Sequence, residues 1–293
     1  MSRYIREVTM SARALLAVLA AAAVLAAPPM RAQDARQTVQ SPRIYIFDNG
    51  RISGLDPKLF NFTKEELKEV DFVNSSYLIE HPKGTLMFEA GAVMDSHFEP
   101  DGSPVTEGIM SATRPLAPQL ASAGYRPPDI TFFARSHYHS DHTANANDFA
   151  GATWIVQKAD RDWMFAEKPA GIIQPASYSA LRSSKTIVLE DQDHDVFGDG
   201  SVVIMSTPGH TPGHQVLFVR LARTGPVLLA GDLYHYPEER TTGRVPTFEF
   251  DAEQSRASRR RVEEFLKQTG AQLWIEHDIP THAQLPKAPE FVD

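Results

Sequence analysis

A short segment after an apolar run holds four side chains that could bind metal. It reads ARSHYHSDHTAN at residues 134–145, and its candidate ligands are His137, His139, Asp141 and His142. His137 and His139 are two residues apart, so an extended backbone directs both rings to the same side, where they can share one ion. Asp141 and His142 follow at once, where a turn can direct them to a second point nearby. The segment therefore predicts two ions, and each needs further ligands from elsewhere, since hydrolytic zinc takes three or more protein donors.

Three later residues occupy a similar position, each a polar residue just past an apolar run. They are His210 in IMSTPGHTPGH, Asp232 in VLLAGD and His277 in LWIEHD. The repeated TPGH at 207–214 offers two histidines, but Pro212 and Gly213 oppose a helix that would put both on one face. We therefore expect only one of them to bind metal and favour His210, with His214 supporting the site or starting the next strand.

The composition narrows the chemistry. The chain of 293 residues has no cysteine, so a disulfide framework and a cysteine-containing zinc site are both excluded. Its formal net charge of −8 provides no general attraction for nucleic acid phosphates, and we expect no nucleic acid partner. With 42% hydrophobic residues it is long enough to bury a sizeable core.

The N-terminus has the pattern of a targeting segment. Arginines precede the apolar run ALLAVLAAAAVLAA at 14–27, which is shorter than a spanning helix, and small residues follow it. Residues 1–32 are therefore predicted to be a signal peptide, and residues 33–41 a linker. The prediction is a periplasmic or secreted protein with no stable membrane span after signal removal.

The elements that must position the candidate ligands alternate along the rest of the chain. Strands are expected at 43–50, 72–91 (a hairpin that turns at 81–84), 129–136, 152–157, 185–190, 201–206, 214–221, 226–232 and 272–278. Helices are expected at 114–125, 158–168 and 253–270, the last with its arginines on a solvated face. Residues 92–115 are expected to form a long loop that could cover a site, and 169–184 to be irregular. One mixed α/β domain over 42–293 is the simplest organisation.

These motifs resemble the metallo-β-lactamase-fold hydrolases, over roughly residues 72–278. Within that superfamily, TPGHTPGHQ, HPKGTLMFEAG, IVQKAD and the EHD ending resemble the N-acyl homoserine lactonase group. The resemblance implies a four-layer αββα sandwich with two metal ions at one edge. It also implies that His137, His139 and His210 hold one ion, that Asp141, His142 and His277 hold the other, and that Asp232 bridges them.

The expected activity is the opening of lactones or related carboxylic esters. A hydroxide held between two divalent ions is a nucleophile at neutral pH, and the ions can also take up the charge that develops on the carbonyl and leaving oxygens. Zinc is the expected metal, and iron, manganese or cobalt would fit the same ligands. The resemblance further suggests that Asp141 passes a proton to the leaving group. The small-molecule substrate is expected to be a lactone or an ester; the sequence leaves open whether the chain acts alone or as a homodimer.

Two positions depart from the lactonase pattern. Where known lactonases have a tyrosine three residues after the bridging aspartate, this chain has His235, between Tyr234 and Tyr236. Any of the three could donate a hydrogen bond to the substrate, and Tyr234 and His235 are the catalytic candidates. The usual Asp-x-Gly is Glu89-Ala90-Gly91 here.

Other activities remain open at this point. The same two-metal site could serve a β-lactamase or other amidase, but known lactamases of this fold do not use a bridging carboxylate such as Asp232. It could also serve a phosphotriesterase. A metal-binding protein without catalytic activity is a further alternative, but the presence of all seven candidate ligands argues against it.

Overall fold

The structure is a computed structural model that describes residues 39–169 and 171–293. Residues 39–293 form one compact unit. The predicted signal peptide (1–32) and residues 33–38 of the predicted linker lie outside the described residues. Val39, at the end of that linker, is buried.

Two sheets form the centre of this unit. Over the described residues, the first sheet has nine strands in the order β4-β5-β1-β2-β3-β6-β7-β8, with β14 paired to β1, and the second has five in the order β13-β12-β11-β10-β9. The strands of the first sheet are β1 (Arg43–Ile52), β2 (Phe72–His81), β3 (Gly84–Phe88), β4 (Val105–Glu107), β5 (Met110–Ala112), β6 (Phe132–Ala134), β7 (Thr153–Gln157), β8 (Thr186–Leu189) and β14 (Phe291–Val292). Those of the second are β9 (His194–Asp195), β10 (Val202–Ser206), β11 (Gln215–Arg220), β12 (Pro226–Leu229) and β13 (Gln272–Trp274).

The sheets pack face to face because alternate residues of their strands are apolar. Ile44 and Ile46 of β1 and Leu86 and Phe88 of β3 contact the second sheet's inner face, which includes Leu217, in one buried cluster. The residues between them in sequence, Tyr45 and Met87, belong to a separate cluster on the outer face of the first sheet. The period-two pattern thus gives β1 and β3 two buried faces.

Helices cover both outer faces. The helices are α1 (Leu116–Ser122), α2 (Ser140–Thr143), α3 (Lys158–Met164), α4 (Pro175–Tyr178), α5 (Pro237–Thr242), α6 (Ala252–Thr269) and α7 (Ile279–Gln284). Leu116 and Leu120 of α1 pack on the first sheet, and Val262 and Leu266 of α6 pack on the second. No helix within the described ranges is long and apolar enough to cross a membrane.

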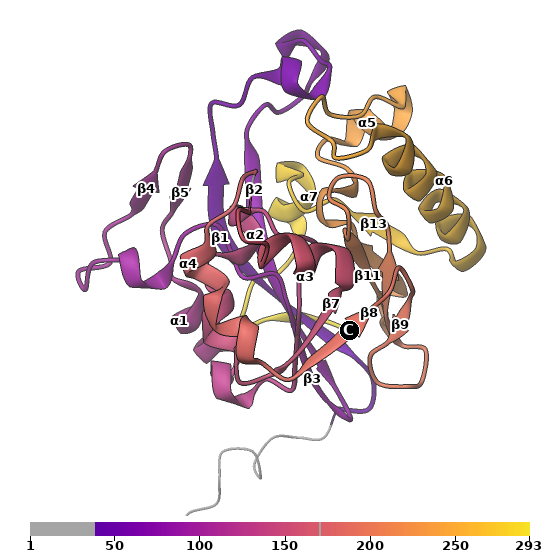
Figure 1. The fold of residues 1–293 in the computed structure, drawn as a ribbon. Helices are drawn as coiled ribbons and strands as arrows, with labels where there is room; N and C mark the ends of the chain where they lie inside the picture. The colour runs from indigo at the N-terminus through magenta and orange to yellow at the C-terminus, as the bar shows by residue number, and fades with distance from the viewer. Residues whose placement is uncertain (1–38, 170) are drawn as a thin grey trace, which may run out of the picture. The chain divides into compact units, whose positions relative to one another are not determined.

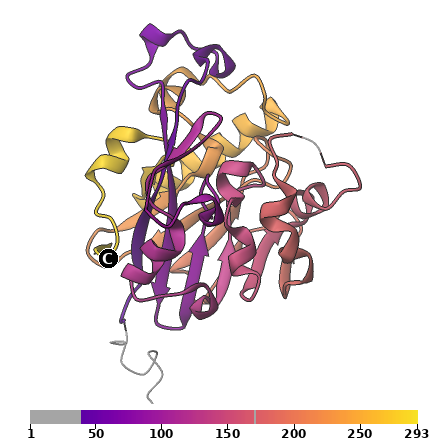
Figure 2. The ribbon, with the colours of Figure 1, turned by 90° about the vertical axis from the view of Figure 1, so that its left-hand side faces the viewer.

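The predicted αββα order is therefore confirmed. In Figure 1, α1 and α4 lie toward the left and α6 at the right, with β1, β2, β11 and β13 of the two sheets between them. Figure 2 shows the magenta helices in front of the indigo and purple strands of the first sheet. The predicted hairpin turn is also present, because His81 pairs with Gly84 between β2 and β3.

Three expectations about local structure were wrong in part. The predicted loop 92–115 contains the hairpin β4–β5, whose second strand joins the first sheet through Arg51 and Ile52 of β1. The predicted irregular segment 169–184 contains α4 and a 3-10 helix (Ser179–Ser183). Elements of three to five residues are too short to show a hydrophobic period, which explains why the sequence did not reveal them.

The third correction concerns the arginines of α6. Arg259 is buried rather than solvated, and its guanidinium forms an ion pair with the buried Glu239 of α5. It also donates to the carbonyl of Leu233 over 2.7 Å. Arg259 therefore anchors the chain that follows Asp232 to α6.

Candidate metal centre

The candidate ligands lie where strands of both sheets end. His137 follows β6, His210 follows β10, and Asp232 follows β12. His277 follows β13, which pairs in parallel with β12, so these two strands end at the same edge. The local turn predicted for the HxHxDH segment is the one-turn helix α2, which begins after His139 and carries Asp141 and His142.

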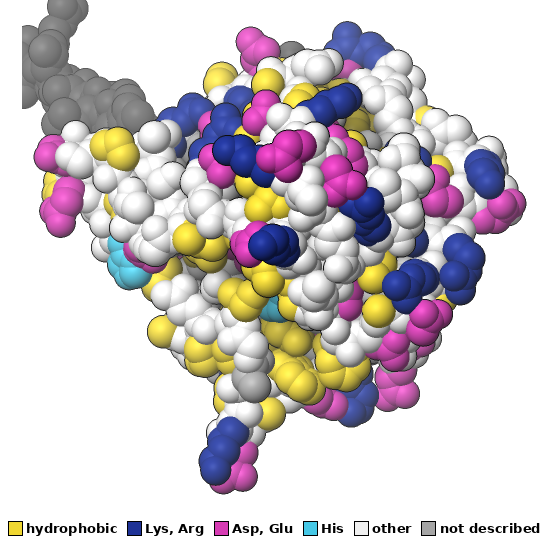
Figure 3. Space-filling model, turned by 90° about the horizontal axis from the view of Figure 1, so that it is seen from above, with side chains coloured by type: hydrophobic (Ala, Val, Ile, Leu, Met, Phe, Trp, Pro, Cys, Tyr) yellow, Lys and Arg dark blue, Asp and Glu magenta, His cyan; other side chains and the backbone are white. Residues whose placement is uncertain are grey.

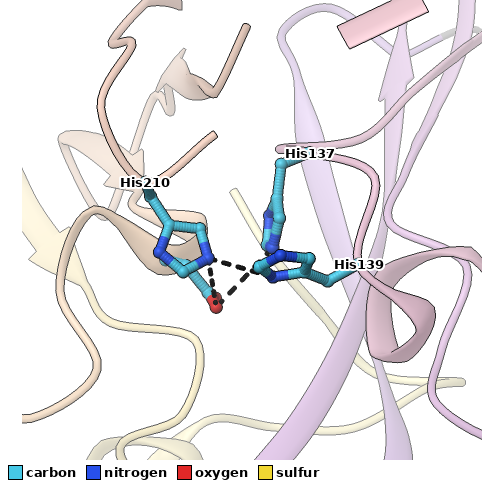
Figure 4. A group of neighbouring side chains, drawn as sticks. His137, His139 and His210 are labelled. Carbon is cyan, nitrogen blue, oxygen red and sulfur yellow. Dashed lines mark hydrogen bonds and ion pairs between the residues drawn. The ribbon is translucent and has the colours of Figure 1, made fainter. Parts of the chain in front are cut away.

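One group of donors consists of His137, His139, His210 and Asp232. Each offers one ligand atom, and these atoms all lie within 4.8 Å of one another. The closest pair is His139 Nδ1 and His210 Nε2, 3.1 Å apart. Figure 4 shows the rings of His137 and His139 converging from one segment of the chain with that of His210 from another.

A second group consists of Asp141, His142 and His277, again with ligand atoms within 4.8 Å. His142 Nε2 is 3.3 Å from Asp141 Oδ2, and His277 Nε2 is 3.8 Å from the same oxygen.

The Asp232 carboxylate lies between the two groups and turns one oxygen to each. Its Oδ2 is 3.4 Å from His210 Nε2 and 3.7 Å from His137 Nε2. Its Oδ1 is 3.2 Å from His142 Nε2 and 3.0 Å from His277 Nε2. This is the arrangement required of a carboxylate shared by two cations.

Unpaired polar atoms indicate that the donors fit metal ions. His137 Nε2, His142 Nε2 and Asp232 Oδ1 are buried and have no hydrogen-bond partner. Buried polar groups without partners are costly, and imidazole nitrogens and carboxylate oxygens are the ligands of zinc and similar ions. Two divalent cations at these groups would satisfy all three atoms.

The opposite ring nitrogens are held by the protein. His277 Nδ1 is 2.8 Å from the carbonyl of Val73, and His137 Nδ1 is 2.9 Å from Ser136 Oγ. His142 Nδ1 is 3.2 Å from Glu89 Oε2, and the other oxygen of Glu89 accepts from the Ser136 amide. These contacts orient the Nε2 atoms of the three rings toward the site.

His214, the other histidine of the repeat, has a supporting position. Its Nε2 accepts a hydrogen bond from the Asp232 amide over 3.1 Å, and its Nδ1 is 2.8 Å from Thr207 Oγ1. Because both ring nitrogens are occupied, His214 fixes the backbone of Asp232 and leaves the donor role to His210.

Gly231 permits this close packing. Its φ is +47°, and a Cβ there would lie 2.3 Å from Ser136 Cβ and 3.1 Å from His214 Nε2. No other residue could bring β12 this close to the segment that carries His137.

The protonation states of His137, His139 and Asp232 suit metal binding. Burial lowers the pKa of His137 well below its usual range and that of His139 to about 3, so both rings are neutral at pH 7. Burial alone would raise the pKa of Asp232, but the surrounding histidines hold it well below its usual value. Neutral imidazoles and an ionised carboxylate can bind a cation without first losing a proton. His142 differs: burial alone would lower its pKa, but nearby carboxylates raise it well above its usual range, so that ring must lose a proton to bind a cation.

A cavity of about 90 Å³ opens above the two groups. Its floor includes His139, Asp141, Asp232, His235 and His277, and its walls are apolar: Ile52, Leu55, Phe60, Phe72, Ile109, Met110, Ile172 and Phe248. Ile109 and Met110 belong to the β4–β5 hairpin, so the segment 92–115 does reach the site as predicted. Figure 3 looks onto this face and shows hydrophobic side chains gathered around a hollow in which histidine is visible.

The structure separates the three candidates after Asp232. His235 lines the cavity, and its Nε2 is 3.1 Å from Asp232 Oδ2. The Tyr234 hydroxyl instead donates to Glu263 of α6 over 3.1 Å, and its ring packs against the outer face of the second sheet. The Tyr236 hydroxyl donates to the carbonyl of Val70. Consecutive side chains of an extended segment point in opposite directions. Of the two catalytic candidates, Tyr234 therefore points away from the cavity and His235 lines it, and a catalytic role for either stays a prediction.

Three buried acids around the site were not predicted from the sequence: Asp160, Glu249 and Glu276. A fourth, Glu89, was noted only as a departure from the usual Asp-x-Gly. Glu89 stands out by its positive φ of 67°, which only the structure reveals. Glu276 directly precedes His277, and its Oε1 is 3.6 Å from His142 Nδ1. An acid next to a candidate ligand was the available signal for Glu276, whereas Glu249 lies 39 residues from the histidine that it contacts.

Asp160 holds the loop that carries His210. Its Oδ1 accepts from Thr211 Oγ1 and from the Gly213 amide, each over 2.8 Å. Its other oxygen is 4.0 Å from the buried guanidinium of Arg135. Burial raises the pKa of Asp160 to about 6 against the opposing effect of Arg135.

Comparisons with known proteins agree with this geometry. Residues 70–267 match the family model of the Metallo-beta-lactamase superfamily. The N-acyl homoserine lactonase AttM of Azorhizobium caulinodans is 28% identical over 262 residues, covering 86% of this chain and 98% of AttM.

Two solved structures extend the comparison. One is an N-acyl homoserine lactone hydrolase with the product N-hexanoyl-L-homoserine at its catalytic metal center. It is 25% identical to this chain with a TM-score of 0.70, and the match covers 87% of this chain and 100% of the hydrolase chain. The other is AidC, a dizinc quorum-quenching lactonase, which is 19% identical with a TM-score of 0.59 over 87% and 95% of the two chains and so supports the fold alone.

The raised pKa of Asp160 predicts a pH-dependent stability. The folded protein keeps the Asp160 proton up to about pH 6, whereas the unfolded carboxyl titrates near 3.8. The contribution of this group to stability is therefore greatest below the lower pKa and falls as pH rises through the window, by on the order of 3 kcal/mol. Urea unfolding of the metal-free proteins should show the free energy of unfolding of the wild type falling relative to that of Asp160→Asn between about pH 4 and 6. A constant difference across this window would contradict the assignment.

Proposed function

The chain belongs to the metallo-beta-lactamase superfamily, and we propose that it is a metal-dependent hydrolase that opens lactones such as N-acyl homoserine lactones. One observation carries the proposal: two groups of metal donors share Asp232 at the floor of a cavity with apolar walls. The relatives named N-acyl homoserine lactonase, which match this chain over nearly their whole length, support the choice of substrate.

We propose that His137, His139, His210 and Asp232 hold one divalent ion, and that Asp141, His142, His277 and Asp232 hold the other. Zinc is the metal that this donor set favours. When bound, two such ions lower the pKa of water and act as Lewis acids toward an ester carbonyl. The protein then has to orient the substrate, exclude solvent and handle protons.

The cavity walls suit an amphipathic substrate. Phe60, Phe72 and Phe248 offer apolar surface to an acyl chain, while the polar floor receives the lactone ring. Burying the acyl chain would contribute roughly 0.8 kcal/mol per methylene group and would exclude water from the reacting bond.

Two floor residues can handle hydrogen bonds and protons. The pKa of Asp141 is lowered to about 2, because the nearby His142 and His277 outweigh the opposing effect of burial, so it is ionised at neutral pH. We propose that this carboxylate takes up a proton during the reaction and passes it to the leaving oxygen. Burial alone would lower the pKa of His235, but Asp232 and Glu239 raise it to about 10. His235 therefore has a ring N–H available at neutral pH to donate to a substrate oxygen.

We also propose that the protein is exported, on the pattern of residues 1–32. Expressed in a Gram-negative host, the full chain should be recovered from the periplasm with a new N-terminus near residue 33. An uncleaved chain in the cytoplasm would contradict export and leave the hydrolase proposal intact.

The substrate class is tested with purified protein loaded with zinc or manganese. A pH-stat assay should detect acid release from N-acyl homoserine lactones and other γ-lactones, and dialysis against a chelator should abolish it until metal is restored. Aryl esters, a cephalosporin and paraoxon complete the panel. Turnover of the cephalosporin or paraoxon without lactone hydrolysis would overturn the proposal in favour of an amidase or a phosphotriesterase.

Substitutions at His235 and Tyr234 test which of these two side chains assists the reaction. His235→Phe keeps an aromatic ring but removes the donor, and the loss of one hydrogen bond to the reacting oxygen should lower kcat by about 10²–10³. His235→Tyr, which restores a donor, should recover part of that loss. Tyr234→Phe should retain nearly wild-type kcat. A larger loss in Tyr234→Phe than in His235→Phe would show that the wrong residue was chosen.

A further inference from the structure

One buried carboxylate connects a candidate metal ligand to the wall of the cavity. Glu249 Oε1 is 3.2 Å from His210 Nδ1, and only 2% of each side chain is exposed. The other oxygen of Glu249 accepts a hydrogen bond from Ser255 Oγ in the first turn of α6. Because His210 Nε2 faces Asp232, a proton on Nδ1 donated to Glu249 leaves the Nε2 lone pair directed into the site.

Backbone bonds strengthen this link. The Phe250 amide donates to the carbonyl of His210 over 3.2 Å, and the Asp251 amide donates to that of Gly209 over 2.9 Å. Gly209 has a φ of +141°, and a Cβ on it would meet the Ser255 amide at 2.2 Å. The loop 243–251 and the His210 loop are thus packed together with the start of α6.

The same loop supplies an aromatic wall of the cavity. The Phe248 ring lies 5.9 Å from the His210 ring, 5.8 Å from His235 and 5.3 Å from Phe60. Phe248 is still 37% exposed, so side-chain packing alone does not enclose it. Hydrogen bonds of its neighbours also hold it: the Thr247 amide donates to the carbonyl of Leu59 over 2.7 Å, and Glu249 and Phe250 bond to the His210 loop.

We infer that Glu249 is a positioning residue that couples metal binding by His210 to the order of loop 243–251. The inference rests on the proposed metal centre, and it assigns Glu249 no contact with the reacting atoms. A metal ion bound to Nε2 would hold the His210 ring in one orientation. The ring would then hold Glu249 through its Nδ1 contact, and Glu249 would restrain the loop that carries Phe248. By the same linkage, a loosened loop weakens metal binding at the group that contains His210.

Two variants and a matched control test this coupling. Glu249→Ala removes the acceptor, and Glu249→Gln keeps an oxygen of the same reach without the charge. Glu253→Ala removes an exposed carboxylate at the start of α6, whose side chain is 81% exposed. Two quantities are measured: zinc affinity by competition with a chromogenic chelator, and hydrogen exchange of loop 243–251 with and without zinc.

We expect Glu253→Ala to bind two zinc ions with the same affinities as the wild type. In both proteins, hydrogen exchange of the loop should slow when zinc is added. Glu249→Ala should bind one of the two ions about 10- to 100-fold more weakly. It should also lose the zinc-dependent protection of the loop, with Glu249→Gln intermediate. Wild-type zinc affinity and loop protection in Glu249→Ala would overturn the inference.

The readouts separate this inference from the proposed substrate. Neither measurement uses a lactone. A wild type that binds two ions but hydrolyses no lactone would therefore contradict the proposed substrate and leave the inference about Glu249 standing. If Glu249→Ala does not fold, Glu249→Gln decides: weaker zinc binding supports the coupling, and unchanged binding rejects it.

Discussion

The site depends on one buried carboxylate facing five histidines. Asp232 has histidine nitrogens within 3.8 Å on both of its oxygens, from His137, His142, His210, His235 and His277. Such a charge is stable in the interior only with partners close by, and the rings of both donor groups supply them. The fold must therefore bring separate strand ends to the same carboxylate within a few ångströms.

Several features outside the ligand set follow from that requirement. Gly231 lets β12 approach Ser136, and His214 holds the Asp232 amide. Asp160 ties down the loop before β11, while the buried Arg259–Glu239 pair anchors the chain after Asp232. The buried charges among these, on Asp160 and in the Arg259–Glu239 pair, are costly by themselves. A metal ion bound only by the folded chain would return stability through linkage, so the centre and the fold support one another.

The sequence predicted what is encoded locally. The HxHxDH spacing pointed to four side chains and the ends of long apolar runs to His210, Asp232 and His277, because a strand positions the residue that follows it. The structure brings these side chains together in two groups. It could not decide between Tyr234 and His235, since neighbouring side chains point in opposite directions and only packing on α6 reveals which one faces the cavity. It also missed the β4–β5 hairpin, whose strands have three residues each, and Glu249, which meets His210 only through the tertiary fold.

The central claim is that seven side chains from four strand ends form one centre for two ions. The most direct test is the metal stoichiometry of the purified protein, measured by titrating the metal-free chain with zinc and counting bound ions by elemental analysis. The account predicts two equivalents per chain for the wild type, because Asp232 presents one oxygen to each donor group. A stoichiometry of one or none would contradict it.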